Sequence, residues 1–219
     1  MTRPTRGRPP KGSPGLTRSA ILDAAVAVID AEGVENVSMR TVARRLGVDA
    51  KSLYNHVDGK DGLLDAVAEH VLAGFALPAP TGSLGDDLLA FARGFRRATL
   101  RHPRAAALVL TRQVASPVGL APTAAVLSVL RAAGFGPAES VHLLRSLLAL
   151  TVGALLREVD AGPGFGVGEG VAERRRTLEE SGFDALVDVA PELARCDHEE
   201  EFEFALGLMV GAVVARGRG

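Results

Sequence analysis

The chain is poor in aromatic residues and cysteine. Of its 219 residues none is tryptophan, one is tyrosine and one is cysteine, Cys196. A single cysteine excludes a disulfide within the chain, which suits a reducing compartment. Low aromatic content, abundant alanine and leucine, and the absence of an alternating apolar pattern favour helices over strands. We therefore expect an all-α fold.

Long apolar runs are also absent. No stretch reaches the ~18 uncharged apolar residues of a membrane span. The N-terminal stretch is basic and rich in proline and glycine, and it has no apolar centre of the kind found in signal peptides. We expect a soluble cytoplasmic protein with no membrane partner.

The formal net charge of −1 conceals an asymmetry along the chain. Residues 1–60 carry ten Lys/Arg against six Asp/Glu, and the remainder carries fifteen against twenty. Basic charge near the N-terminus is what binding to nucleic-acid phosphates requires.

The segment 38–60 has the spacing of a helix-turn-helix. Ser38 can cap a helix, Gly47 can end it, and Asp49 can cap the next one. Counting from Met39, the chain has a small residue at the fifth position, glycine at the ninth and an apolar residue at the fifteenth, as two closely packed short helices require. The second helix has an outward-facing polar set that favours DNA binding: Lys51, Ser52, Tyr54, Asn55 and His56.

Caps, prolines and glycines predict the remaining elements. A break at 77–83 separates a helix-turn-helix domain at 16–76 from a larger helical domain at 83–216. Residues 161–171 form a glycine-rich loop. No strand precedes it and no Lys-Ser/Thr follows it, so a nucleotide site is disfavoured. Further helices are predicted at 17–32, from Lys60 onward, and at 84–101, 104–115, 122–133, 138–160 and 199–215, with one or two short ones in 172–195.

Residues 1–15 form a basic arm that we expect to be disordered. Arg6-Gly7-Arg8-Pro9 resembles the core of an AT-hook, in which Arg6 and Arg8 would enter the minor groove of A·T-rich DNA. The alternative is a solubilising tail that contacts phosphates loosely or not at all.

The predicted helices 138–160 and 199–215 are too apolar for ordinary surface helices. They could form a hairpin buried within one chain, or half of a four-helix interface with a second copy. We favour the homodimer because helix-turn-helix proteins usually bind DNA as two-fold dimers.

Four segments of the chain carry a resemblance to one protein family. Residues 21–67 (ILDAAVAVIDAEGVENVSMRTVARRLGVDAKSLYNHVDGKDGLLDAV) resemble the DNA-binding domain of the tetracycline-repressor (TetR) family without a gap. FRRATLRHP (95–103), LRAAGFGP (130–137) and DHEEEFEFALGLMVGA (197–212) resemble the C-terminal domain of the tetracycline-repressor type. The resemblance implies an all-helical homodimer that binds double-stranded operator DNA, with a C-terminal domain that binds a small-molecule effector and dimerises.

The same resemblance assigns DNA contacts by position. Tyr54, His56 and Lys60 would mostly bind phosphates, although Tyr54 could be a packing residue and His56 a polar helix end. Ser52 is a further expected contact. The expected readers of base edges in the major groove are Arg40, Ala50, Lys51 and Asn55.

The chain departs from the family's tetracycline receptors at two positions. These receptors coordinate a magnesium–drug chelate through histidines, and Ala76 and Val109 occupy the corresponding positions here. We therefore expect no magnesium–tetracycline binding, no metal site and no other cofactor. Candidate effector-binding residues are the polar groups on the apolar helices: Arg112, Gln113, His142, Arg145 and Ser146.

Two other classes of protein fit the sequence less well. An enzyme would need a catalytic constellation, but the 197–201 cluster (DHEEE) lacks a second histidine at metal-ligand spacing and better fits a solvated acidic helix start. An architectural protein coating A·T-rich DNA through the 1–15 arm is disfavoured by the large domain without basic excess. A ligand-responsive repressor that releases a palindromic operator is the favoured function.

Overall fold

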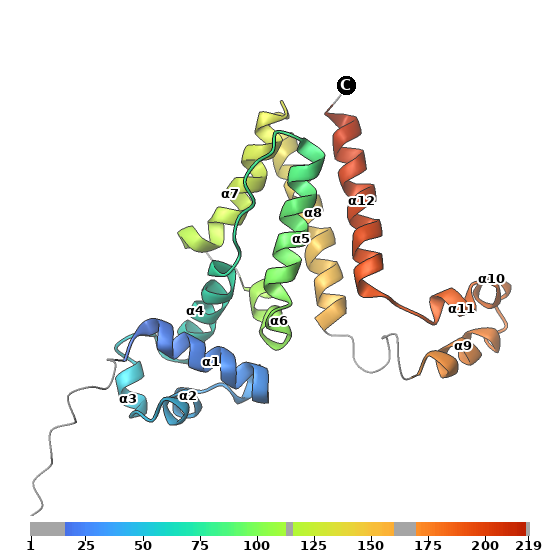
Figure 1. Ribbon diagram of the computed structural model, residues 1–219. Coiled ribbons are helices and arrows are strands. Elements are labelled where there is room, and N and C mark those ends of the chain that lie inside the picture. The colour runs from blue at the N-terminus through green and yellow to red at the C-terminus, as the bar shows by residue number, and fades with distance from the viewer. Residues whose placement is uncertain (1–15, 113–115, 160–169, 218–219) are drawn as a thin grey trace, which may run out of the picture.

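The computed structural model describes residues 16–112, 116–159 and 170–217, and all of its regular elements there are helical, which confirms the all-α class (Figure 1). The arm 1–15, Gln113 and most of the glycine-rich loop lie outside the described residues. The elements are α1 (Arg18–Glu32), the 3-10 turn η1 (Val34–Asn36), α2 (Met39–Leu46), α3 (Ala50–Leu53), α4 (Gly59–Ala73), α5 (Leu84–Thr99), α6 (Pro103–Thr111), α7 (Pro117–Ala132), α8 (Pro137–Val159), α9 (Val171–Glu179), α10 (Asp184–Asp188), α11 (Ala190–Leu193) and α12 (His198–Arg216).

The helix-turn-helix spacing predicted the turn correctly. The Ser38 hydroxyl accepts from the Thr41 amide at 3.1 Å, and the Thr41 hydroxyl accepts from the Ser38 amide at 2.8 Å, forming a capping box. Gly47 ends α2 in the left-handed conformation, with φ of 67°. The Asp49 carboxylate accepts from the Lys51 amide at 2.8 Å and starts α3. Each break between helices therefore has a local cause.

The head, α1 to α4, has a compact apolar core that includes part of the next domain. Ile21, Val42, Leu53 and Leu63 are fully buried in it. The same cluster contains three residues of α6: Ala105, Leu108 and Val109. The head core is therefore completed by a helix that follows the predicted domain break.

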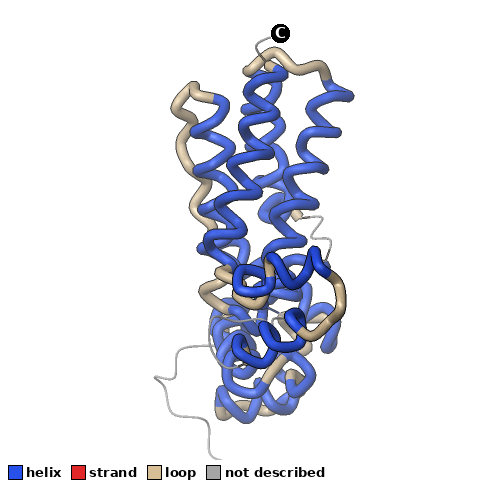
Figure 2. The backbone as a smooth tube through the Cα atoms, turned by 90° about the vertical axis from the view of Figure 1, so that its right-hand side faces the viewer, coloured by secondary structure: helices blue, strands red, loops and turns tan. Residues whose placement is uncertain are grey.

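The second apolar cluster lies among α5, α7, α8 and α12, which run side by side in the upper part of the molecule (Figures 1 and 2). Phe202 and Leu206 of α12 and Leu130 of α7 are almost completely buried there. Two bidentate pairs add to this packing, Arg93 with Glu203 and Arg96 with Glu158. The first pair joins α5 to the N-terminal half of α12, and the second joins α5 to the end of α8.

Helices α9 to α11 form a small arm that stands away from the bundle (Figure 1). The Arg174 guanidinium of α9 donates to the Ala194 carbonyl oxygen at 3.0 Å and ties the two ends of the arm together. Phe183 and Leu193 leave 67% and 55% of their surface exposed. Three short helices occupy the region where one or two were expected.

Helix α7 begins five residues earlier than expected. Ser116 caps it by accepting from the Gly119 amide at 3.2 Å, and Pro117 occupies the first turn, where a proline needs no hydrogen-bond partner. Pro122 lies inside the helix. The expected start at Pro122 is wrong because Pro117 and Ser116 already supply the start signal.

One described helix, α8, has the length and apolar composition of a membrane span. Its best 18-residue window has a mean hydropathy of 1.4, and 28% of that window is buried. Core helices of soluble proteins meet the same criterion, so this is weak evidence for a membrane. The low burial shows that much of α8 faces outward in a single chain.

We expect Gly47→Ala to destabilise the protein by about 1 kcal/mol, because an alanine in left-handed backbone has an unfavourable contact between its Cβ and the following carbonyl oxygen. Apart from Gly47 and its two chain neighbours, no residue has an atom within 4 Å of a Cβ added at this site, so the cost is one of local backbone conformation and not of a clash with the rest of the fold. Urea unfolding at fixed protein concentration, followed by circular dichroism, measures it. Gly47→Asn is the matched control and should lose less, because asparagine tolerates this conformation better. Equal losses would contradict the explanation.

Candidate DNA-binding surface and ligand cavity

Helix α3 is one turn long and presents its polar residues to solvent. Leu53 is fully buried and Val57 is 6% exposed, so the apolar side of this segment is fixed to the head core. Tyr54 is 56% exposed and is therefore not a core residue. Lys51 and Asn55 are also exposed. The segment is a rigid support for side chains that face outward.

Three further predicted DNA contacts are less free to move, because their side chains are hydrogen-bonded within the head or half-buried. The Ser52 hydroxyl donates to the Asp49 carbonyl oxygen at 2.6 Å, which fixes its rotamer. Ala50, the first residue of α3, and His56, three residues beyond the end of α3, are half-buried. All three lie within the segment that follows the turn.

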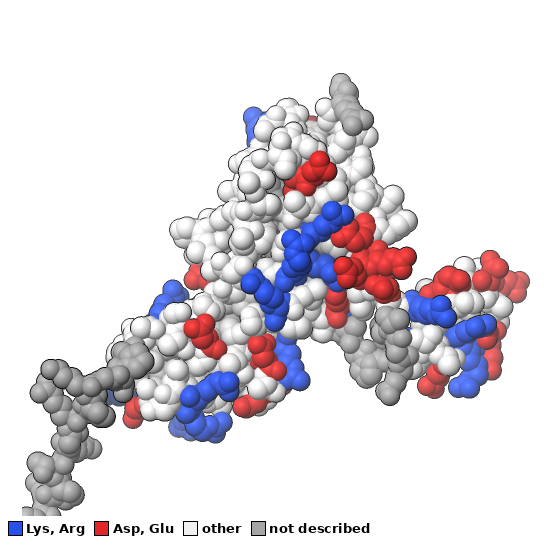
Figure 3. All heavy atoms as spheres, viewed as in Figure 1, with Lys and Arg blue, Asp and Glu red and all other residues white. Residues whose placement is uncertain are grey.

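Arg40 and Lys60 flank this segment from α2 and α4. Arg40 is exposed on α2, where basic atoms gather at the lower edge of the head in Figure 3. The Lys60 ammonium donates to the Glu35 carbonyl oxygen at 3.3 Å, joining the start of α4 to η1. The predicted DNA contacts in the described residues therefore come from three consecutive helices. Arg6 and Arg8 lie outside the described residues.

The predicted effector residues that the structure describes lie at the end of α6 and along α8. Arg112, at the end of α6, pairs with Asp65 and, at 3.5 Å, with the Asp61 carboxylate, both on α4. The hydrogen bond to Asp65 raises the pKa of the Arg112 guanidinium. This arginine thus joins the end of α6 to α4 of the head. Of the others, His142, Arg145 and Ser146 are exposed on α8, and Gln113 is outside the described residues.

The opposite end of α6 is joined to α1. The His102 Nδ1 lies 2.8 Å from the Asp30 carboxylate. Arg104 donates to the carbonyl oxygens of Asp30 and Ala31 at 3.1 and 2.8 Å, at the C-terminal end of α1 where carbonyls lack helical partners. Helix α6 therefore holds both outer helices of the head. His102 is therefore part of the junction between α6 and α1.

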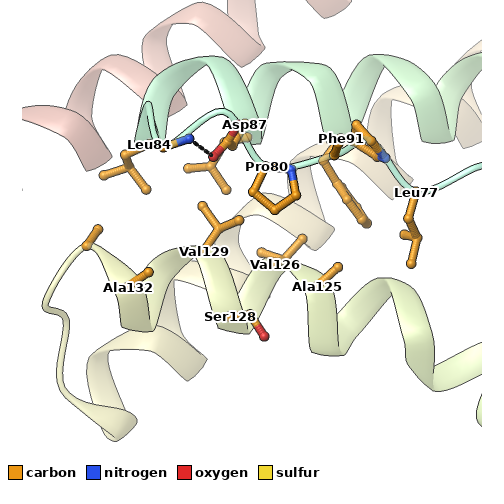
Figure 4. A pocket seen from close by; sticks show the side chains of 15 residues that line it. Leu77, Pro80, Leu84, Asp87, Phe91, Ala125, Val126, Ser128, Val129 and Ala132 are labelled. Carbon is orange, nitrogen blue, oxygen red and sulfur yellow. Dashed lines mark hydrogen bonds between the residues drawn. The ribbon is translucent and has the colours of Figure 1, made fainter.

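A cavity of about 530 Å³ lies between α5, α7 and the connector 77–83 that joins α4 to α5 (Figure 4). Figure 4 shows Leu77 and Phe91 directed toward α7, with Val126 and Val129 directed back toward α5. Sequence reasoning missed this site because it searched for polar groups on apolar helices. The full lining is Leu77, Pro78, Ala79, Pro80, Gly82, Leu84, Asp87, Leu88, Phe91, Ala125, Val126, Ser128, Val129, Ala132 and Ala133.

Asp87 holds the far end of the connector. Its carboxylate accepts from the Thr81 amide and the Thr81 hydroxyl, each at 2.7 Å, and from the Gly82 amide at 3.3 Å. These bonds, led by the Thr81 amide, hold the pKa of Asp87 below its usual value. The carboxylate is therefore committed to the connector.

A second, much smaller cavity of about 30 Å³ lies on the inner side of α7, between α5 and α8. Phe91 and Val126 line both cavities, whereas Thr123, Leu147 and Thr151 line only the inner one. The two spaces are separate but share a wall.

The acidic cluster at the start of α12 has a structural explanation. Asp197 caps the helix by accepting from the amides of Glu199 and Glu200 at 3.0 and 3.1 Å. Among the described residues, no group of three or more His, Cys, Asp or Glu side chains is arranged to hold a metal ion.

A helix-turn-helix head joined through one helix to an apolar bundle defines a DNA-binding regulator of transcription. Family comparison makes this specific. Residues 21–67 match the tetR family of bacterial regulatory proteins, and residues 77–215 match the tetracyclin repressor-like C-terminal domain. The chain belongs to the TetR family of transcriptional regulators, as its sequence predicts. Because this family consists of regulators, the prediction that the protein is not an enzyme is also confirmed.

Two relatives and one solved structure are similar over most of the chain. An HTH-type transcriptional regulator of Saccharopolyspora erythraea is 41% identical over 69% of this chain and 66% of its own length. The repressor DrrR1 of Streptomyces coeruleorubidus is 36% identical over 69% of this chain. The chain thus spans only about 66% and 56% of these relatives. The Streptomyces coelicolor TetR family protein ActR, in complex with actinorhodin, aligns over 94% of this chain and 99% of its own, with 27% identity and a TM-score of 0.82.

We expect acid to destabilise the wild-type protein more than Asp87→Asn. A depressed folded-state pKa gives stability that is complete above the unfolded value of about 3.9 and is lost as pH falls through the folded value. The asparagine variant lacks this titration. Urea unfolding at pH 5 and at pH 3 should therefore show a smaller pH-dependent loss in Asp87→Asn, with Asp86→Asn, its exposed neighbour, behaving as wild type. Equal losses in all three proteins would refute the role of Asp87.

Proposed function

We propose that the protein is a ligand-responsive repressor that binds a palindromic operator as a homodimer and releases it when a small molecule binds the C-terminal domain. The observation that carries the proposal is α6, which is packed into the head core and ion-paired to α4 while belonging to the sensor side of the chain. A change in the sensor therefore reaches both heads of a dimer and alters their spacing. The name of the relative DrrR1, a repressor, supports the sign of the effect.

We assign the DNA contacts to the side chains that follow the turn. Arg40, Lys51 and Asn55, with the methyl group of Ala50, would face base edges in the major groove. Tyr54, Ser52, His56 and Lys60 would bind phosphates. Arg6 and Arg8 would reach the adjacent minor groove. Residues 16–76 would form the DNA-binding domain and residues 83–216 the sensor, a division that the two family matches support.

The effector is not expected to be a magnesium–tetracycline chelate. Val109 is buried in the head core and Ala76 is exposed at the end of α4, and neither offers a ligand for a metal. The proposed place of action is the bacterial cytoplasm, on nucleoid DNA. An architectural role would instead give a long footprint, so protection of one short palindrome separates the two functions.

We expect Tyr54→Ala to weaken operator binding about tenfold or more, because hydrogen bonds to charged groups contribute about 1.5–3 kcal/mol. A gel-shift assay with the DNA upstream of the protein's own gene measures this at fixed salt concentration. The matched control is Leu193→Ala on α11, since Leu193 and Tyr54 are exposed to 55% and 56%. Comparable binding by wild type and Tyr54→Ala would count against the assigned surface.

The homodimer would use the exposed faces of α8 and α12. Phe204 and Leu208 of α12 leave 67% and 64% of their surface exposed, and Leu148 of α8 leaves 37%. Phe204 and Leu208 are four residues apart and share one side of α12. Large apolar side chains in such a row are typical of a subunit interface. Covering them with a second copy would also remove the exposed surface of α8.

We expect Leu208→Glu to shift the protein from dimer to monomer, because a carboxylate buried at an apolar interface has no partner. Analytical ultracentrifugation at micromolar concentration measures the species directly. Leu120→Glu, at a site on α7 exposed to 53%, should remain dimeric. A dimeric Leu208→Glu would exclude this face as the interface, whatever its effect on DNA binding.

A further inference from the structure

We propose that the cavity between the connector 77–83 and helices α5 and α7 is a binding site for a neutral, predominantly hydrophobic small molecule. The inference rests on the proposed function in one respect, namely that occupation of this site is the signal that reaches the head. It names both the place and the chemical class of the effector.

Size and shape fit a small organic molecule. Ligand pockets usually enclose about 300–1,000 Å³, and this one encloses about 530 Å³. The walls come from three separate segments, so a molecule between them would contact α5, α7 and the connector at once (Figure 4). Pro78 and Pro80 restrict the connector backbone to extended conformations. One wall is therefore stiff before any ligand binds.

The charge of the lining excludes a charged ligand. No Lys, Arg or His lines the cavity. Its one ionisable group is Asp87, whose oxygens already accept from Thr81 and Gly82. The Ser128 hydroxyl donates to the Ala124 carbonyl oxygen within α7. An anion or cation would lose its hydration here without gaining a partner, which is strongly unfavourable.

The cavity is connected to the DNA-binding head through two phenylalanines. Phe91 lines the cavity, and its ring packs edge-on against Phe75 with centroids 5.3 Å apart. Phe75 lies two residues beyond the end of α4 and packs in the same way against Phe95 at 5.9 Å. A Cβ added at Gly94 would lie 2.9 Å from the Phe75 ring, so Phe75 has little room. A ligand that displaces Phe91 must therefore move Phe75 and the end of α4.

A neutral fluorescent probe tests the site directly. The probe is N-phenylnaphthylamine, and the charged comparison is anilinonaphthalene sulfonate. Because the chain has no tryptophan, Leu77→Trp places a single energy donor on the connector. We expect saturable energy transfer from this tryptophan to the neutral probe, and at least about tenfold weaker binding of the sulfonate, equivalent to about 1.4 kcal/mol. Val187→Trp on α10 is the matched donor, since Val187 and Leu77 are both 42% exposed, and it should show much less transfer.

Filling the cavity gives an independent test in otherwise wild-type protein. Ala125 lines the cavity, whereas the adjacent Ala124 is exposed and does not. We expect Ala125→Phe to weaken binding of the neutral probe about tenfold or more, and Ala124→Phe to change it less than about twofold. Circular dichroism verifies that both variants fold. Should Ala125→Phe fail to fold, the energy-transfer comparison still decides the location.

Operator binding, measured with and without the probe, separates this inference from the proposed function. We expect the probe to release the operator from Ala124→Phe and much less from Ala125→Phe. Equal binding of the sulfonate, equal transfer from both donors, or equal probe affinity in the two phenylalanine variants would overturn the inference while leaving operator binding intact. Failure of the unliganded protein to bind any operator would refute the proposed function instead, whatever the probe measurements show.

Discussion

The head core depends on a helix from the other side of the chain. Ala105, Leu108 and Val109 of α6 are buried in the same apolar cluster as the helix-turn-helix. Burying a leucine or valine side chain stabilises a fold by roughly 1.5–3 kcal/mol. Packing against α6 therefore contributes to the stability of the head, and a motion of α6 changes the contacts of the head core.

Polar contacts at the two ends of α6 convert this packing into a defined orientation. Arg104 and His102 hold the C-terminal end of α1, and Arg112 holds the first turns of α4. Apolar contacts alone would permit sliding, whereas hydrogen bonds of fixed length do not. The turn geometry at Ser38, Gly47 and Asp49 then fixes α3 and the residues that follow it relative to α4. The contacts that link the C-terminal helices to the DNA-binding surface are therefore short and well packed.

Local signals in the sequence were sufficient for the head. The capping box at Ser38, the left-handed Gly47 and the Asp49 cap each act within a few residues, so spacing alone predicted them. The predicted start of α7 at Pro122 is wrong because Pro117 can also occupy a first turn and follows a capping residue, Ser116, which accepts a hydrogen bond from the Gly119 amide. The exposure of Lys51, Tyr54 and Asn55 was predictable for the same reason, since burial of Leu53 leaves the other side of the segment open to solvent.

The sensor site could not be predicted because it depends on distant segments. Its lining residues are mostly Ala, Val, Leu and Pro, which have no chemical signature when read along the chain. Arg112 is the opposite case. Its charge makes it conspicuous in the sequence, but it pairs with Asp61 and Asp65 and so joins α6 to α4. Polar residues on apolar helices are a poor guide when the effector itself is neutral.

A neutral ligand is sufficient to control a head held in this way. Coupling between two sites in allosteric proteins is typically about 1–3 kcal/mol, a range that displacement of one buried aromatic ring can supply. Phe91 is 8% exposed and touches both the cavity and Phe75, so its position cannot change without altering the packing at the end of α4. The connector restricts the alternative responses, because Asp87 fixes its far end through Thr81 and Gly82. The free energy of binding is thus directed toward α4, the helix that follows the helix-turn-helix and contributes Lys60 to the proposed DNA-binding surface.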